Sequence, residues 1–259
     1  MGPIILEAWK HSLSTGNLPP SHLESVITLL PKEGKDIKDI KNWRPITLSN
    51  CDSKIITKAI SLRTSKVLDS IIDPSQTAYV PGRSVADNLR SNFFYKNHCC
   101  KNDVDAVLIS LDAKKAFDSV DHKYIEETLI AYGFGPGFIQ IFKTLYRNIT
   151  ARILVNGFAS ESIKIERGVK QGDALSCAIF ILCIDPLLRN LNKNKKIEEV
   201  KIRRKMQQMK KSALKVQLMQ MILVLSVKKA LNAYNKSSMN TKDLQEDQGW
   251  NSMLTRLKF

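Results

Sequence analysis

The sequence predicts a fold that mixes helices with strands and contains an antiparallel hairpin. Apolar residues at helical spacing fill two long segments, 52–72 and 175–191. Residues 105–111 have the composition of a buried strand, Asp-Ala-Val-Leu-Ile-Ser-Leu. A hairpin is indicated at 151–165, where Asn156-Gly157 separates two strand-like segments.

Shorter patterns predict the remaining elements, taken in chain order. Residues 27–30 have strand composition and end at Pro31, and residues 46–48 are a second short candidate strand. A helix is expected over 84–94, after the Pro81-Gly82 turn. Two more helices are expected at 124–132, which stops at Gly133, and at 138–146, which follows a Gly-Pro-Gly sequence.

Composition limits the class of protein. Of the 259 residues 43% are apolar, which excludes a wholly disordered chain, and the longest apolar runs are too short to span a bilayer. The formal net charge of +15 favours an anionic partner, most simply nucleic acid, although the alternative of a soluble protein that is merely basic stays open. The five cysteines have neither zinc-ligand spacing nor a disulfide framework. We therefore expect an intracellular protein of the cytoplasm or nucleus, not secreted, with no membrane contact and no indication of an oligomer.

The chain has two compositions, with a seam near residues 201–206. Residues 1–200 carry 27 basic and 22 acidic residues, whereas residues 201–259 carry 13 basic and 3 acidic ones. All nine prolines and ten of the eleven glycines precede the seam. A natural domain needs turn residues to reverse its chain, so the tail is not expected to pack as a native strand pair, and its Lys, Gln, Met and Leu favour helix.

The first chemical motif is a carboxylate directly after the predicted strand at 105–111. Asp112 begins the sequence Asp-Ala-Lys-Lys-Ala-Phe-Asp, which ends at Asp118. An acid at a strand end is well placed to hold a hard cation, because the strand fixes it and the open end admits substrate. The alternative is that Asp112 caps the following helix, and both interpretations stay open.

Two further motifs contain glycines or arginines. In Gly-Val-Lys-Gln-Gly-Asp-Ala-Leu-Ser, residues 168–176, the glycines allow close backbone approach to a ligand and Gln171 can hydrogen-bond to it. Arg44 and Arg83, in Asn-Trp-Arg-Pro-Ile and Pro-Gly-Arg-Ser, are candidate phosphate ligands. The alternatives are an ordinary strand-to-helix loop and solvated surface arginines.

In this order and spacing, the motifs resemble the reverse transcriptase of non-LTR retrotransposons, the LINE-type elements that include jockey-like ones. The strings are LPKEGKD, NWRPITL, AYVPGRSVADNL, LDAKKAFDSVDH, ILVNG and GVKQGDALS, within residues 15–200. The resemblance implies an α+β fold: right-hand polymerase fingers and a partial palm with an antiparallel sheet, and no thumb. It divides the chain into an N-terminal extension with fingers at 1–95, palm at 96–200, and a basic aberrant tail at 201–259 that is not native palm.

The resemblance implies roles for particular residues. The carboxylate of Asp112 and the carbonyl of Ala113 would hold metal ions, with Asp112 as the catalytic carboxylate. Phe117 would lie under the incoming sugar and exclude a 2′-hydroxyl by bulk. The implied nucleotide, template and phosphate contacts are Gln171, Gly172, Lys32, Arg44 and Arg83.

The implied activity is RNA-directed DNA polymerisation by two-metal phosphoryl transfer, with Mg²⁺, an RNA template, a DNA primer and a deoxynucleoside triphosphate. The family's second acidic motif, Tyr-Ala-Asp-Asp, is expected a few tens of residues after Ser176. The sequence contains no adjacent pair of aspartates. We therefore predict that this chain is catalytically incomplete, and the alternative is a non-catalytic, basic nucleic-acid-binding remnant.

A frameshift accounts for both the missing motif and the seam. Read one base earlier, the codons of Met219-Gln220-Met221 allow the string Tyr-Ala-Asp-Asp. The Ala and the second Asp are forced, whereas the Tyr and the first Asp are only allowed. With permitted synonymous codons, the same shift can turn residues 248–259 into a string ending Lys-Thr-Glu-Ile, which resembles the family's next palm motif. In this interpretation the basic run at 201–205 is an accident of out-of-frame reading, and the alternative is a nuclear-localisation or nucleic-acid patch.

Overall fold

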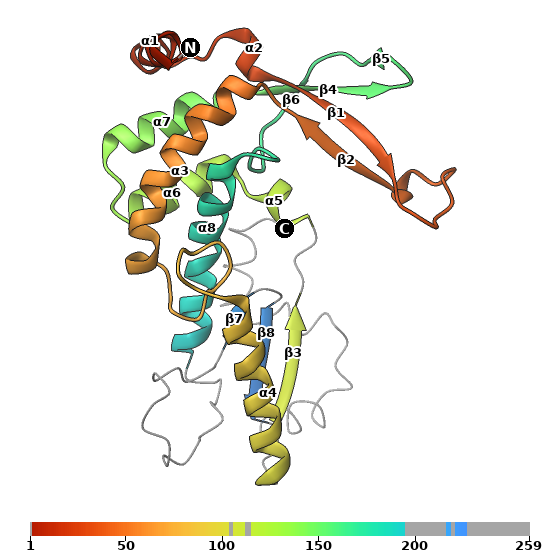
Figure 1. Ribbon diagram of the computed structural model, residues 1–259, viewed down its shortest axis with the longest axis vertical. Coiled ribbons are helices and arrows are strands. Elements are labelled where there is room, and N and C mark those ends of the chain that lie inside the picture. Colours follow the sequence, from red (N-terminus) through yellow and green to blue (C-terminus); the bar gives the residue numbers. More distant parts are fainter. Residues whose placement is uncertain (1, 104–105, 112–114, 195–215, 219–220, 227–259) are drawn as a thin grey trace. The chain divides into compact units, whose positions relative to one another are not determined.

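The computed structural model describes residues 2–103, 106–111, 115–194, 216–218 and 221–226 (Figure 1). The chain divides into two compact units, and each is described by itself. Unit 1 comprises residues 1–64 and 117–180, and unit 2 comprises residues 65–116 and 181–259. Two long helices, α3 (Cys51–Ile71) and α8 (Ala174–Lys193), contribute residues to both units.

Unit 1 contains a five-stranded mixed sheet in the order β2-β1-β4-β5, with β6 also paired to β4 (Figure 1). The first strand lies antiparallel to β2, with Val26 opposite Leu48, and parallel to β4, with Ile27 opposite Ile153. The strands are β1 (Glu24–Pro31), β2 (Trp43–Leu48), β4 (Thr150–Val155), β5 (Phe158–Ala159) and β6 (Ile163–Lys164).

The helices of unit 1 bury apolar side chains at helical spacing. Asp121 caps α6 by accepting a 2.9 Å bond from the N–H of Lys123, and this helix buries Ile125 and Leu129 at positions i and i+4. The helices lying wholly within this unit, with one 3₁₀ turn, are α1 (Gly2–Thr15), α2 (Pro20–Leu23), η1 (Ile40–Asn42), α6 (His122–Ala131) and α7 (Pro136–Tyr146). The short helix α5 (Ala116–Ser119) begins one residue before the boundary at Phe117.

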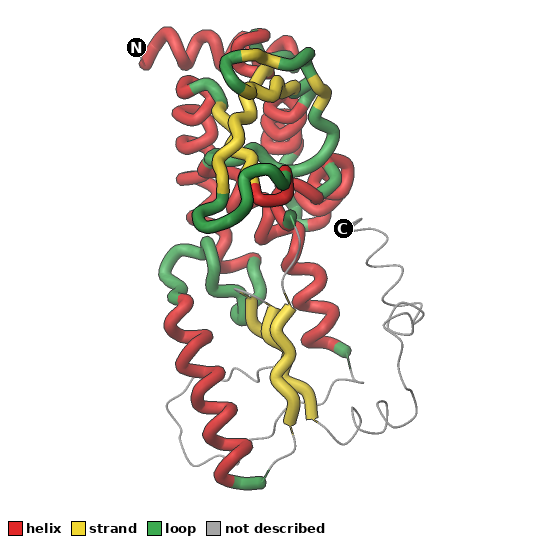
Figure 2. Tube along the Cα trace, turned by 90° about the vertical axis from the view of Figure 1, so that its right-hand side faces the viewer, coloured by secondary structure: helices red, strands yellow, loops and turns green. Residues whose placement is uncertain are grey.

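Unit 2 contains a three-stranded antiparallel sheet in the order β3-β8-β7. Strand β3 (Ala106–Leu111) pairs with β8 (Met221–Ser226), which also pairs with β7 (Val216–Leu218). Helix α4 (Val85–Lys101) runs along one face of this sheet (Figures 1 and 2). Ser84 caps α4 by accepting a 3.2 Å bond from the N–H of Ala86.

Helix α8 is long and apolar enough to cross a membrane by length and composition. Its most apolar window has a mean hydropathy of 1.7, and 67% of that window is buried inside the protein. Ile181, Leu182 and Leu188 are almost completely buried. This burial is that of a core helix, as the sequence predicts for 175–191.

The predicted helices and the hairpin are present, with changes at their ends. Helix α4 extends beyond the predicted residue 94 to Lys101, and α1 was not predicted. The predicted second hairpin strand, 158–165, is interrupted between β5 and β6. The interruption follows from Ser160, whose hydroxyl accepts a 3.0 Å bond from the N–H of Ile153 in place of a regular ladder.

The tail differs from expectation over residues 216–226, where β7 and β8 form a hairpin paired with β3. The expectation rested on the composition of the whole tail. Within it, Ile222-Leu223-Val224 is a short apolar run with two β-branched residues, which favours a strand. The other residues of 201–259 lie outside the described part of the chain.

Candidate functional site

In unit 1 the structure joins two of the sequence motifs through their backbones. The N–H of Val169 donates a 2.8 Å bond to the carbonyl of Phe117, and the N–H of Gly168 donates a 2.7 Å bond to the carbonyl of Val120. The Phe117 ring is half-buried and stacks on Phe180, with centroids 4.4 Å apart. Val169 precedes Gln171 by two positions in the chain. Its bond to Phe117 therefore links Phe117 directly to the segment that carries Gln171.

The two glycines of this loop have different roles. Gly168 has φ +84°, and a Cβ there would lie 2.8 Å from Cα of Asp118. The sequence suggested that this glycine allows close approach to a ligand. In the structure the close approach of Gly168 is instead to the protein's own backbone. Gly172 has φ +73° with open space around it, so among the described residues nothing crowds the predicted contact.

Gln171 and Asp173 connect the loop to neighbouring elements. The Oε1 atom of exposed Gln171 accepts a 2.7 Å bond from the N–H of Thr47 in the edge strand β2. Asp173 begins α8, where its carboxylate accepts a 2.9 Å bond from the N–H of Leu175. Burial raises the pKa of Asp173, and this rise is opposed mainly by the Leu175 bond and next by a Thr57 bond.

The loop also carries a half-buried lysine, Lys170, whose charge acts on the imidazole of His122. Burial lowers the pKa of Lys170, and the charge of Asp173 opposes the change. The Lys170 Nζ lies 5.9 Å from the centroid of the Tyr146 ring, which stabilises the remaining charge. Burial also lowers the pKa of His122, and its Nε2 lies 2.9 Å from the Gly168 carbonyl oxygen. Because a carbonyl only accepts, Nε2 carries the proton of the neutral ring.

A cavity of about 300 Å³ lies next to this loop, within unit 1. Its walls come from β1, β2, β4 and the loop, and they include Ile27, Thr47, Asp118 and Gln171. The volume is at the lower end of the range for small-molecule pockets. The Thr47–Gln171 bond joins two of its walls.

The two predicted finger-region basic residues of unit 1 have different surroundings. Lys32 donates a 2.7 Å bond from Nζ to the carbonyl of Lys41, across the loop between β1 and β2. Arg44 is exposed on β2 opposite Leu30, and no ion pair joins it to any residue in the described part of the chain. Of the two, Arg44 has the geometry of an available phosphate ligand.

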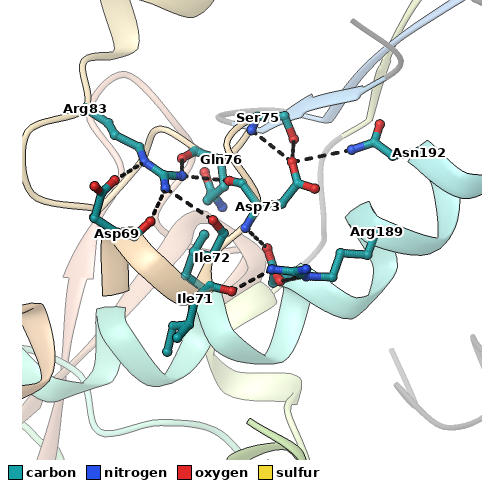
Figure 3. Close-up of polar contacts among 10 residues, drawn as sticks. Asp69, Ile71, Ile72, Asp73, Ser75, Gln76, Arg83, Arg189 and Asn192 are labelled. Atoms are coloured by element: carbon teal, nitrogen blue, oxygen red, sulfur yellow. Dashed lines mark hydrogen bonds and ion pairs between the residues drawn. The ribbon is translucent and has the colours of Figure 1, made fainter. Parts of the chain in front are cut away.

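Arg83, in unit 2, has a different environment from the predicted phosphate contact. All five guanidinium N–H groups donate to acceptors of the segment 69–76, as Figure 3 shows. They bind the Asp69 carboxylate at 2.9 Å and four backbone carbonyls, those of Asp69, Ile72, Asp73 and Gln76. The side chain closes the end of α3, so this geometry argues against a phosphate role.

A second buried charge in unit 2 fastens α8 to the same segment (Figure 3). Asp185 is 0% exposed and accepts a 2.7 Å bond from the N–H of Asp73 and a 2.5 Å bond from Nε of Arg189. Arg189 also donates a 2.5 Å bond to the carbonyl of Ile71. Asp185, one of the acids after Ser176, therefore has a structural role.

The two predicted metal-binding residues, Asp112 and Ala113, lie outside the described residues. Within the described ranges, no group of three His, Cys, Asp or Glu side chains is arranged to hold a metal ion. The structure thus brings Phe117, Gln171 and Gly172 into one loop pair, with β2 attached through Thr47. Arg83 belongs to the other unit.

Sequence reasoning missed the contacts that join the motifs. His122 ends the string LDAKKAFDSVDH, yet nothing in its spacing from Gly168 signals that the two meet. The role of Thr47 was also not visible, because its backbone and not its side chain makes the contact. A hydrogen bond between segments about 124 residues apart leaves no local pattern.

Comparison with known proteins gives a consistent family. The family described as "Reverse transcriptase (RNA-dependent DNA polymerase)" matches residues 30–206. The "Transposon TX1 uncharacterized 149 kDa protein" of Xenopus laevis is 39% identical over 193 residues, which cover 74% of this chain and 15% of that protein. The Pol polyprotein of retrotransposable element R2DM of Drosophila melanogaster is 32% identical over 188 residues, 73% of this chain and 18% of that protein. The chain thus spans less than a fifth of the length of these two relatives.

Solved structures give the same fold at low identity. Apo telomerase from Candida tropicalis, truncated of its C-terminal domain, aligns with 92% of this chain and 51% of its own, at a TM-score of 0.52 and 15% identity. The mixed helix and sheet architecture therefore fits polymerase fingers and palm. On the family match and these relatives, the chain belongs to the reverse transcriptases, and within them to those of non-LTR retrotransposons.

Proposed function

We propose that this chain is a reverse transcriptase domain that binds nucleic acid but does not extend primers. The observation that carries the proposal is the register of the unit 2 sheet, in which Leu111 lies opposite Met221. The chain positions that adjoin this pair are Asp112 and Gln220. Gln220 carries an amide, and an amide supplies no negative charge to a dication.

The same register supports the frameshift. Strands β7 and β8 flank residues 219–220, and the shifted string requires a strand on each side of its Ala-Asp-Asp. The codons that would give that string are those of Met219, Gln220 and Met221. Under this proposal, the family's second acidic motif would be encoded in the other frame at the chain positions between β7 and β8.

The described residues do not fit a two-metal Mg²⁺ site. Asp173 and Asp185 are buried, and their carboxylates accept bonds from backbone N–H groups that end or begin helices. Asp118 is exposed beside the unit 1 cavity. Two dications need several converging carboxylate oxygens, and no such group occurs among the described side chains.

Binding does not depend on those carboxylates. The proposal assigns the nucleotide contact to Phe117, Gln171 and Gly172, which backbone bonds bring into one loop pair, with Arg44 exposed on the neighbouring β2. The formal charge of +15 favours RNA and DNA as partners. These contacts, and the predicted ones of Lys32, are part of the proposal.

Primer extension tests the loss of activity. The chain is incubated with a primed RNA template, deoxynucleotides and Mg²⁺, beside a second chain translated from the same gene with the shift corrected before codon 219. We expect no extension by the first chain and extension by the second, which Asp112→Asn in the second abolishes. Extension by the first chain would refute the proposal.

Binding is tested separately, by fluorescence anisotropy of labelled single-stranded RNA at several salt concentrations. A chain ending at Ser226 keeps β7 and β8 but removes the rest of the tail. We expect this shorter chain to retain salt-dependent binding. Loss of all binding on this truncation would mean that residues 227–259 alone attract RNA, against the proposal.

A further inference from the structure

Tyr79 combines a strained backbone with an exposed ring. Its φ is +57°, in the left-handed region that costs an aromatic residue conformational energy. The side chain is nevertheless 58% exposed, so core packing does not account for the conformation. A glycine or asparagine would adopt the same backbone with less strain.

The residues on both sides of Tyr79 are buried and fixed. Gln76 and Val80 are 2% and 4% exposed. The Oε1 atom of Gln76 accepts a 3.0 Å bond from the N–H of Ala78, and Thr77 accepts a 2.7 Å bond from Asn88 of α4. The loop is thus anchored immediately before and after its exposed ring.

Arg83 completes this support. Its guanidinium binds the carbonyls of Asp73 and Gln76 at 2.7 Å (Figure 3). Its backbone N–H donates a 3.2 Å bond to the carbonyl of Val80. The arginine that the sequence suggested as a ligand therefore holds the loop that presents Tyr79. Strain that is enforced by surrounding contacts is typical of functional positions.

We propose that Tyr79 is a stacking surface for an unpaired base of single-stranded nucleic acid. The proposal rests on the proposed nucleic-acid binding and adds the residue and the type of contact. A flat, exposed ring stacks on any base because every base has a π-face, and the chain's positive charge attracts the strand. Holding the ring in place before binding reduces the entropy lost when a base stacks.

The test compares variants that keep the loop and change the ring. Tyr79→Gly removes the ring and relieves the positive φ, so its melting temperature is expected to equal or exceed that of the parent chain. Its affinity for single-stranded RNA, measured by anisotropy at fixed salt, is expected to fall by about 5- to 150-fold. Tyr79→Phe keeps the ring and is expected to bind within about twofold of the parent chain.

Two controls separate stacking from other causes. Phe93, 65% exposed on α4 of the same unit, is an aromatic residue without this backbone strain, and Phe93→Ala is expected to leave binding unchanged. A strand of the same length whose bases are replaced by abasic sites should bind the parent chain and Tyr79→Gly equally. A loss that persists on the abasic strand, or an equal loss in Phe93→Ala, would overturn the proposal.

Failure of this inference is distinct from failure of the proposed function. If the parent chain shows no salt-dependent RNA binding, both are wrong. If the parent chain binds RNA and Tyr79→Gly binds it equally well, only the stacking role is wrong. A ring that serves a protein partner instead would give this second result.

Discussion

Gly168 lies against the backbone of Asp118, so closely that a Cβ atom at position 168 would be 2.9 Å from the Asp118 carbonyl oxygen. This contact, with the Gly168–Val120 and Val169–Phe117 hydrogen bonds, joins the segment after β3 to the segment before α8. The arrangement of Phe117 and Gln171 therefore depends on the absence of a side chain at one position.

Gly168→Ala should destabilise unit 1 by about 3 kcal/mol, because left-handed φ and steric overlap with backbone both oppose a Cβ there. Gly172→Ala is the matched control, since its φ is also positive but its surroundings are open, and it should cost only about 1 kcal/mol. Urea unfolding of both variants measures the difference. Equal costs would show that the Asp118 contact is relaxed in solution.

Asp185→Ala should cost about 2–3 kcal/mol, because it leaves the N–H of Asp73 without an acceptor and breaks the pair with Arg189, whose side chain is 40% exposed. Asp87→Ala breaks the exposed pair with Arg90 and should cost less than about 1 kcal/mol. Thermal or urea denaturation measures both. A small effect for Asp185→Ala would mean that the α8 end is not fastened to segment 71–73 as described.

His122 predicts a pH dependence of stability. Burial lowers its pKa in the folded protein, so the unfolded chain binds more protons as pH falls through the usual value of 6.5. The contribution of His122 is complete above that pH and is lost below it, with a slope of at most about 1.4 kcal/mol per pH unit. His122→Gln keeps a donor for the Gly168 carbonyl and removes the titration.

The measurement is the free energy of unfolding of the parent chain and His122→Gln between pH 5 and 8. The other histidines are common to both chains, so their contributions cancel in the difference. We expect the difference between the chains to change below pH 6.5 and to stay constant above it. A constant difference over the whole range would contradict the buried, neutral imidazole.

Leu223→Pro tests whether β8 is part of the folded protein. Leu223 pairs with Ile109 on one side and with Val216 on the other. Proline in a central strand removes a ladder bond and should cost about 3 kcal/mol or more. Gln217→Pro in the edge strand β7 should cost less. If the melting temperature of Leu223→Pro equals that of the parent chain, residues 216–226 do not contribute to stability.

The elements that the sequence predicted are those with a local cause. The helical spacing of apolar residues predicted α3 and α8, and Asn156-Gly157 predicted the β4–β5 hairpin. The parallel pairing of β1 with β4 was not predictable, because paired residues such as Glu24 and Thr150 lie far apart in the sequence. The short strands β7 and β8 were not predicted, because the composition of the tail as a whole favours helix.

The sequence names candidate site residues, and the structure adds contacts that the sequence does not show. The motifs identified Gln171, Phe117 and Arg83, but the use of all five Arg83 donors by one turn is a property of the folded chain. Tyr79 lies in the same string as Arg83, and only its backbone angle distinguishes it from an ordinary surface tyrosine. Side chains that bind carbonyls leave no pattern in sequence.

The pairing of β1 with β4 has a consequence for synthesis of the protein. Glu24 lies opposite Thr150, so one edge of β1 has no partner strand until 126 more residues have left the ribosome. At about 5–20 residues per second, that interval lasts about 6–25 s. During this time the nascent chain exposes an apolar strand edge, because β2 covers only the opposite edge of β1, and protection by a chaperone would limit aggregation.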